Sequence, residues 1–223
     1  MKNICFVLCS LFCLPVFTQN KSDLGISLGT AYYMGDINPS TLFYSPKINA
    51  GIVYRYNFNT RYVFKSELNY VALSANDKDF SDPYQQARNA SFSSELYDIS
   101  TQFEFNFLPL IFKERKISLS PFVSTGLAAA LILNSSSKKS FEFVYPFALG
   151  IRVTLGKKWS TGVQWSFRKT FNDTNIDGVD NSPLPPSMNS SLINNDWYSF
   201  AGLFLTYKIF DFGIPCPAYE SKF

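Results

Sequence analysis

The stretch 91–107, SFSSELYDISTQFEFNF, alternates apolar and polar residues more clearly than any other part of the chain. One face of an extended chain would carry Tyr97, Ile99, Phe103, Phe105 and Phe107, and the other would carry Asp98, Ser100, Gln102, Glu104 and Asn106. Successive side chains of a β-strand point to opposite faces, so this period of two predicts a strand with one apolar and one polar face.

Blocks with the same period occur on both sides of this stretch, separated by Gly, Pro, Asn, Asp and Ser, which are turn residues. We predict seven further strands at 24–33, 48–58, 61–73, 117–133, 141–155, 159–171 and 197–210. The last block is apolar on both faces, so its pattern leaves open which of its side chains point inward.

The connections between these strands alternate between long and short. Long connections cover 34–47, 74–90, 134–140 and 172–196; the others cover 59–60, 108–116 and 156–158. Lipid offers no hydrogen-bond partners, so a sheet that crosses a membrane must close on itself. The chain is therefore predicted to be all-β, an eight-stranded antiparallel transmembrane β-barrel over 20–212, with short periplasmic turns and longer extracellular loops.

Polarity separates this fold from a soluble barrel such as a lipocalin, or a sandwich, in the export compartment. Charged residues make up 17% of the chain, against about 25% in soluble domains. The polar faces are mostly Gly, Ser, Asn, Gln and Ala, which suits a narrow lumen better than a surface in water. We expect aromatic residues near strand ends to form the interfacial girdles: Tyr32, Tyr33, Tyr62, Tyr97, Trp159, Phe171 and Trp197.

A small set of ionisable residues falls on the predicted lumenal faces: Arg55, Lys65, Glu67, Glu104, Arg152 and Arg168. Charges in a low-dielectric interior must be paired and hydrogen-bonded, so the two glutamates should lie among the cations. This polar network can be a structural plug or the lining of a selective pore rich in positive charge. Eight strands favour the plug, because they leave room only for side chains.

The two ends of the chain lie outside the predicted barrel. A cation at Lys2, an apolar run over 4–17 and a polar stretch after it predict a signal peptide at 1–19, with a retained anchor as the alternative. Three of the four cysteines fall in that segment, so the mature chain keeps only Cys216, in a periplasmic tail at 213–223. A lone exported cysteine suggests either a disulfide to a partner or a free thiol.

Several function classes are disfavoured by composition. The chain has no histidine, which removes Ser-His and Cys-His catalysis and most zinc sites. We therefore expect no enzyme, no cofactor and no metal, and the dispersed basic residues predict no nucleic-acid partner. The segment 173–180 resembles the opening of a calcium loop, but Leu184 stands where that loop needs a glutamate, so a polar loop is the simpler interpretation.

Short motifs along the mature chain resemble the PorG family. They are 32–39 (YYMGDINP), 54–59 (YRYNFN), 103–109 (FEFNFLP), 165–173 (WSFRKTFND) and 216–219 (CPAY). The resemblance implies an outer-membrane barrel of the type IX secretion system, in contact with outer-membrane lipids and with a periplasmic ring built from a lipoprotein and its partner. Cys216 would face that ring. A stand-alone small barrel, with an envelope-structural role or with loops that bind ligands, is the alternative.

Overall fold

The computed structural model describes residues 22–38, 41–112, 117–134, 139–171, 176 and 196–210. In it the chain forms eight β-strands. They are β1 (Ser22–Met34), β2 (Lys47–Asn57), β3 (Tyr62–Asn76), β4 (Ser91–Asn106), β5 (Ile117–Asn134), β6 (Lys139–Leu155), β7 (Trp159–Thr170) and β8 (Trp197–Phe210). Every predicted strand is present. The largest difference is at the end of β3, which continues past the predicted residue 73 to Asn76.

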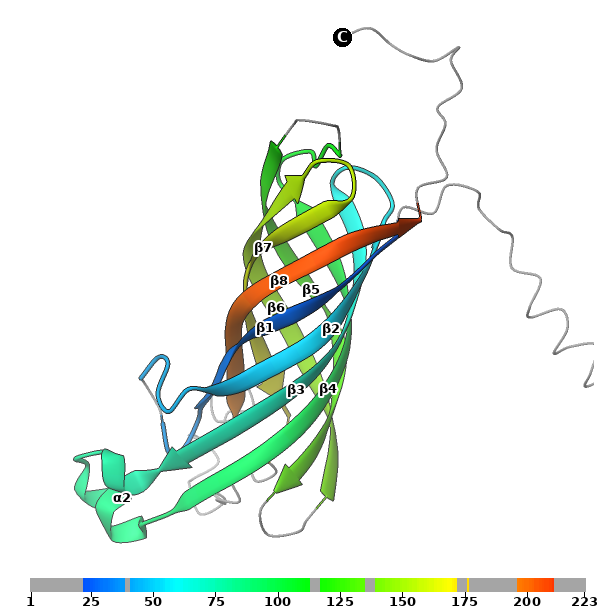
Figure 1. The fold of residues 1–223 in the computed structure, drawn as a ribbon. Helices are drawn as coiled ribbons and strands as arrows, with labels where there is room; N and C mark the ends of the chain where they lie inside the picture. Colours follow the sequence, from blue (N-terminus) through cyan, green and yellow to red (C-terminus); the bar gives the residue numbers. More distant parts are fainter. Residues whose placement is uncertain are drawn as a thin grey trace, which may run out of the picture.

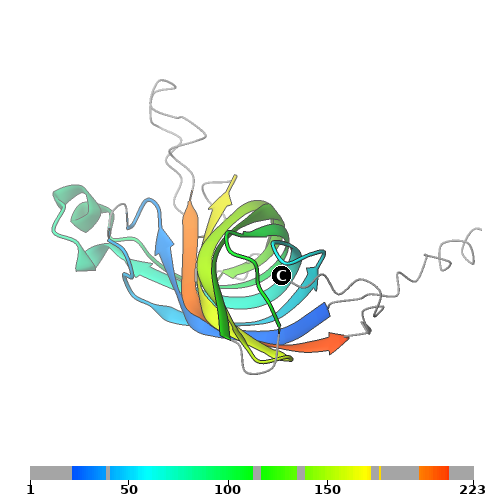
Figure 2. The same ribbon diagram turned by 90° about the horizontal axis from the view of Figure 1, so that it is seen from above.

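The strands close into one antiparallel barrel in the order β1 to β8 (Figures 1 and 2). β1 pairs with β8 from Ser22 opposite Phe210 to Met34 opposite Trp197, so the first and last strands complete the ladder. Closure pairs the backbone groups that would otherwise form an open edge. The predicted fold class is confirmed.

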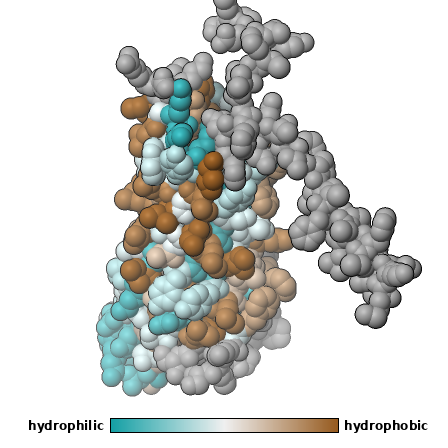
Figure 3. Space-filling model, turned by 45° about the vertical axis from the view of Figure 1, so that its right-hand side comes forward, coloured by the Kyte–Doolittle hydropathy of each residue, from teal (hydrophilic) through white to brown (hydrophobic). Residues whose placement is uncertain are grey.

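The barrel is apolar outside and polar inside. Leu127 is 74% exposed and Ile117 is 70% exposed on the wall, whereas Arg55, Arg152 and Arg168 are fully buried in the lumen. In Figure 3, apolar residues dominate the middle of the wall, and hydrophilic ones gather toward its ends. A soluble barrel would have the reverse polarity, so the soluble alternative is wrong and the wall faces lipid.

The structure settles the inward face of β8. Tyr198, Phe200 and Phe204 point into the lumen and are buried, while Leu203 and Leu205 lie on the outer wall. Both faces are apolar because one faces lipid and the other supplies aromatic rings to the lumen.

Two of the residues expected in the aromatic girdles are not there. Tyr32 and Tyr33 are both fully buried. The ring of Phe43, from the loop after β1, covers Tyr32 at a centroid distance of 4.8 Å, and Tyr33 packs edge-on against Phe92 at 4.9 Å. The other five, Tyr62, Tyr97, Trp159, Phe171 and Trp197, are exposed as expected.

The connection between β3 and β4 forms a small lobe beyond the barrel. It contains the 3₁₀ helix η1 (Asp77–Asp79) and the helix α2 (Pro83–Arg88). Figure 1 places α2 at the barrel end opposite the start of β1 and the end of β8, and Figure 2 shows it to one side of the barrel. We call residues 77–90 the extracellular lobe, because the long connections lie at this end. In the described part of the chain, no helix is long and apolar enough to cross a membrane.

Candidate functional site

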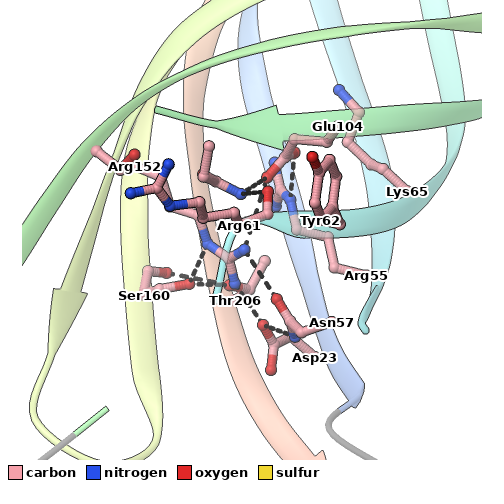
Figure 4. Close-up of polar contacts among 12 residues, drawn as sticks. Asp23, Arg55, Asn57, Arg61, Tyr62, Lys65, Glu104, Arg152, Ser160 and Thr206 are labelled. Atoms are coloured by element: carbon pink, nitrogen blue, oxygen red, sulfur yellow. Dashed lines mark hydrogen bonds and ion pairs between the residues drawn. The ribbon is translucent and has the colours of Figure 1, made fainter. Parts of the chain in front are cut away.

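The lumen near the start of β1 and the end of β8 contains a cluster of charged side chains, shown in Figure 4. Arg55 Nε donates to Glu104 Oε2 at 3.0 Å, and Arg152 Nη1 lies 3.6 Å from Glu104 Oε1. Arg152 also pairs with Asp23, whose carboxylate accepts from Asn57 Nδ2 at 3.0 Å. These five residues come from β1, β2, β4 and β6, so the periplasmic cluster that they form ties four strands together across the lumen.

A second set of charges, the middle cluster, lies further along the lumen. Arg168 contacts Asp98 at 3.3 Å and Glu67 at 3.5 Å, and Lys65 lies 3.5 Å from Glu67. Tyr198 donates its hydroxyl to Asp98 at 2.8 Å. Amide side chains complete the network, because Gln102 and Gln164 both donate to Glu67. Each charge in this cluster therefore has both an ion-pair partner and a neutral hydrogen-bond partner or a ring.

The structure brings the six predicted lumenal residues into these two clusters and adds two aspartates. The cations are Arg55, Lys65, Arg152 and Arg168, and the carboxylates are Glu67, Glu104, Asp23 and Asp98, so four positive charges face four negative ones. Asp98 could have been found, since it lies on the polar face of the clearest alternation. Asp23 precedes the first apolar residue of its block, where no alternation marks it.

Aromatic rings from β8 lie against two of the arginines. The guanidinium of Arg55 is centred 4.2 Å from the ring of Phe204, and that of Arg168 is 4.7 Å from Phe200. Contacts of this kind stabilise a desolvated cation by about 2 kcal/mol. For Arg55, whose Nη1 and Nη2 atoms have no hydrogen-bond partner among the described residues, the ring of Phe204 thus compensates for hydrogen bonds that the guanidinium does not make.

Apolar side chains fill the extracellular half of the lumen. Ile37, from the loop after β1, and Ile176, from the connection before β8, are both fully buried in this core. It also includes Val71, Leu73, Phe92, Leu96, Ala128, Ala130, Ile132, Val144 and Phe200. At the other end, Leu110 is buried, and Lys208 Nζ lies 3.8 Å from the ring centroid of Phe112. The filled lumen supports the plug rather than the pore.

The extracellular lobe is held by an ion pair between the buried carboxylate of Asp77 and the half-buried Arg88. Arg88 donates from Nε and Nη2 to the two carboxylate oxygens of Asp77 at 2.8 and 2.7 Å, and the amide of Ala90 adds a third bond to Asp77 at 2.8 Å. Arg88 and Gln85 also donate to the carbonyls of Asp36 and Ile37. The lobe is thereby fastened to the loop whose Ile37 closes the lumen.

Two groups of this region have shifted pKa values. The hydrogen bonds from Arg88 lower the pKa of Asp77 below its usual value. The pair therefore stabilises the lobe fully above the unfolded-state pKa of about 4, and its contribution is lost as the pH falls through the lower folded-state pKa. Burial and the hydrogen bond to Asp79 raise the pKa of Tyr44 to about 12. Asp77 therefore stays ionised, and Tyr44 stays protonated, at neutral pH.

The remaining sequence predictions concern metal binding, the signal peptide and Cys216. Across the described ranges, no group of three or more His, Cys, Asp or Glu residues could hold a metal ion. The possible calcium loop at 173–180 is outside these ranges except for Ile176, and the signal peptide at 1–19 and Cys216 in the tail are outside them entirely. Their roles remain predictions.

Comparison with solved structures finds other small β-barrels. Neisserial surface protein A is 9% identical, and the match covers 84% of this chain and 97% of that one, with a TM-score of 0.53. Ail of Yersinia pestis is 10% identical, with 86% and 99% covered and a TM-score of 0.44. The N-terminal barrel of Pseudomonas aeruginosa OprF is 14% identical, with 85% and 98% covered and a TM-score of 0.41. The first match agrees with the fold derived above.

No curated protein matches the chain. The family model described as "Domain of unknown function (DUF6089)" matches residues 2–219, nearly the whole sequence. This match gives the chain its family, and the closed barrel with its apolar wall places it in the outer membrane. The chain belongs to the DUF6089 family and is a small outer-membrane β-barrel protein.

Proposed function

We propose that the protein is a stand-alone outer-membrane barrel whose extracellular lobe binds a ligand or a partner outside the cell. The observation that carries this proposal is the ion pair between buried Asp77 and half-buried Arg88, which orders a lobe that is not needed to close the barrel. A connection that only had to join β3 and β4 could be a short turn. The polar network in the lumen then serves stability, because it gives the lobe a rigid support.

The test replaces residues 77–90 with an Asn-Gly turn, which suits a two-residue hairpin. The shortened protein is expressed in a strain that lacks the gene, beside the wild-type protein. We expect the shortened barrel to assemble, as judged by heat-dependent migration on gels, while the strain keeps the phenotype of the deletion. Full complementation by the shortened barrel would contradict a function in the lobe.

A second candidate function is favoured by the sequence motifs that resemble PorG. In this proposal the barrel is a structural subunit of the type IX secretion system and docks the periplasmic ring at the outer membrane. The partner-facing residue would be Cys216, which follows Pro215 and precedes Pro217. The same strains separate the two proposals: a secretion subunit should lose cargo secretion on deletion and regain it with the shortened barrel.

The second candidate predicts a covalent contact at Cys216. The periplasm is oxidising, and the mature chain has no second cysteine, so a disulfide there must join another protein. Non-reducing gels of membranes should then show a larger species that disappears on reduction and in Cys216→Ser. A monomer under both conditions, in a preparation that still contains the ring, would show that the contact is non-covalent.

A further inference from the structure

An apolar groove of about 560 Å³ lies on the outer wall of the barrel. Its sides are formed by residues of four strands, β5 to β8, among them Val123 of β5, Leu149 and Ile151 of β6, and Val163 of β7. The side chains of Leu149, Ile151 and Val163 are 41%, 40% and 47% exposed, so the groove opens onto the outer surface of the barrel. Its lining extends from Phe43, in the extracellular loop after β1, to Phe107 at the periplasmic end of β4.

A small residue and several rings give the groove its shape. Ala201 of β8 lines it, and its small side chain leaves space that larger side chains fill elsewhere on the wall. Trp165 reaches across β8 and donates its indole N–H to the hydroxyl of Tyr32 at 3.1 Å. This bond satisfies the polar group of the tryptophan within the protein, so the ring presents an apolar surface to the groove.

Phe43 closes the extracellular end of the groove at a conformational cost. Its ring lies 5.9 Å from that of Trp165 and 4.8 Å from that of Tyr32, yet the side chain is still 45% exposed. Its φ is 56°, and that of Ser45 is 43°, in the left-handed region that non-glycine residues rarely adopt. Such strain persists only where the surroundings impose it. Here it turns an exposed ring down onto the lipid-facing wall.

We propose that the groove binds one acyl chain of an outer-membrane lipid and that Phe43 clamps the chain from the extracellular side. The groove is continuous with the wall that already faces lipid, so hydrocarbon is the neighbour available to it. Its side chains offer an acyl chain dispersion contacts and close packing. An ordered lipid at this site would be retained when the bulk bilayer is removed.

The experiment counts retained lipid. The protein is reconstituted in vesicles of phosphatidylethanolamine and phosphatidylglycerol, extracted in mild detergent and measured by native mass spectrometry. We expect one bound phospholipid on the wild-type protein. Ala201→Phe fills the groove and should abolish the adduct, and Phe43→Ala removes the clamp and should reduce its occupancy at least several-fold. Ala72→Phe adds the same ring to the wall on β3, away from the groove, and should keep the adduct.

The result can also go against the proposal. The wild-type protein without a lipid adduct, or equal adducts on the wild type, Ala201→Phe and Phe43→Ala, would overturn it. A dimer mass that is lost in Ala201→Phe would instead assign the groove to a second copy of the chain. Heat-dependent gel migration reports whether each variant is folded, and Phe43→Ala, a loop substitution, keeps the test decisive if Ala201→Phe does not assemble.

Discussion

Replacing Glu104 with alanine is expected to destabilise the barrel by about 3–5 kcal/mol, the usual cost of removing one partner of a buried ion pair. Glu104 is fully buried and accepts the hydrogen bond of Arg55 Nε. The Nη1 and Nη2 atoms of Arg55 have no hydrogen-bond partner in the described ranges. Without Glu104, the guanidinium of Arg55 would keep only its contact with the ring of Phe204. Arg152 would lose one of its two carboxylate partners and keep Asp23.

The measurement is the urea midpoint of unfolding in lipid vesicles, read from the band that migrates anomalously until heated. Glu95→Ala is the matched control, because Glu95 is an exposed carboxylate on the same strand, β4. Glu104→Gln keeps an acceptor for Arg55 while losing the charge, so its midpoint should fall between those of the wild type and the alanine variant. Equal midpoints for Glu104→Ala and Glu95→Ala would contradict the structural role of the periplasmic cluster.

The same variant distinguishes the plug from the pore. The extracellular half of the lumen is filled by an apolar core that does not include Glu104. Planar bilayers with the wild-type protein or with Glu104→Ala should therefore show no current of porin size. A large, stable conductance from either protein would mean that the lumen opens along its whole length.

The strands could be predicted because each one carries its own signal. A strand with lipid on one side and a packed lumen on the other must alternate, so 91–107 alone indicates both the strand and its two faces. The alternation also places Arg55 and Glu104 on inward faces. It does not say which charges meet, because the height of each residue in the lumen depends on the stagger of all eight strands. The direct Arg55–Glu104 contact, between residues 49 positions apart, became visible only in the closed barrel.

Contacts made by loops were beyond the sequence pattern for a similar reason. Tyr32 lies on the outer face of its strand, which is where a girdle residue should be, but Phe43 folds back over it. The conformation of that loop depends on the left-handed backbone of Phe43 and Ser45. Neither residue is a glycine or an asparagine, the residues that would have indicated such a conformation in the sequence. The predicted loop at 74–90 likewise contains the end of β3, two short helices and a buried carboxylate, Asp77, that alternation cannot reveal.

Replacing Gly202 with alanine is expected to prevent efficient closure of the barrel. Gly202 of β8 is paired with Gly29 of β1, at the seam between the first and last strands. A Cβ atom at Gly202 would lie 2.4 Å from the carbonyl oxygen of Leu28 and 2.7 Å from the Cα of Gly29, and one at Gly29 would lie 2.2 Å from the carbonyl oxygen of Ala201. These are backbone atoms, which cannot rotate away as a flexible side chain could.

The added methyl group must therefore displace one strand from the other, and the hydrogen bonds of the seam on both sides of the pair would be strained. Overpacking costs about 1–3 kcal/mol and sometimes more, and we expect Gly202→Ala to reach at least the upper end of that range because the ladder itself must shift.

The control is Gly156→Ala, in the turn before β7. Its Cβ would meet nothing within 4 Å, although its φ of 72° still disfavours alanine, so we expect a loss of only about 1 kcal/mol. Refolding into lipid vesicles should give mostly heat-modifiable protein for Gly156→Ala and mostly unfolded protein for Gly202→Ala. Equal folded fractions would show that the seam can widen to accept a side chain, and that the glycine pair is not what permits closure.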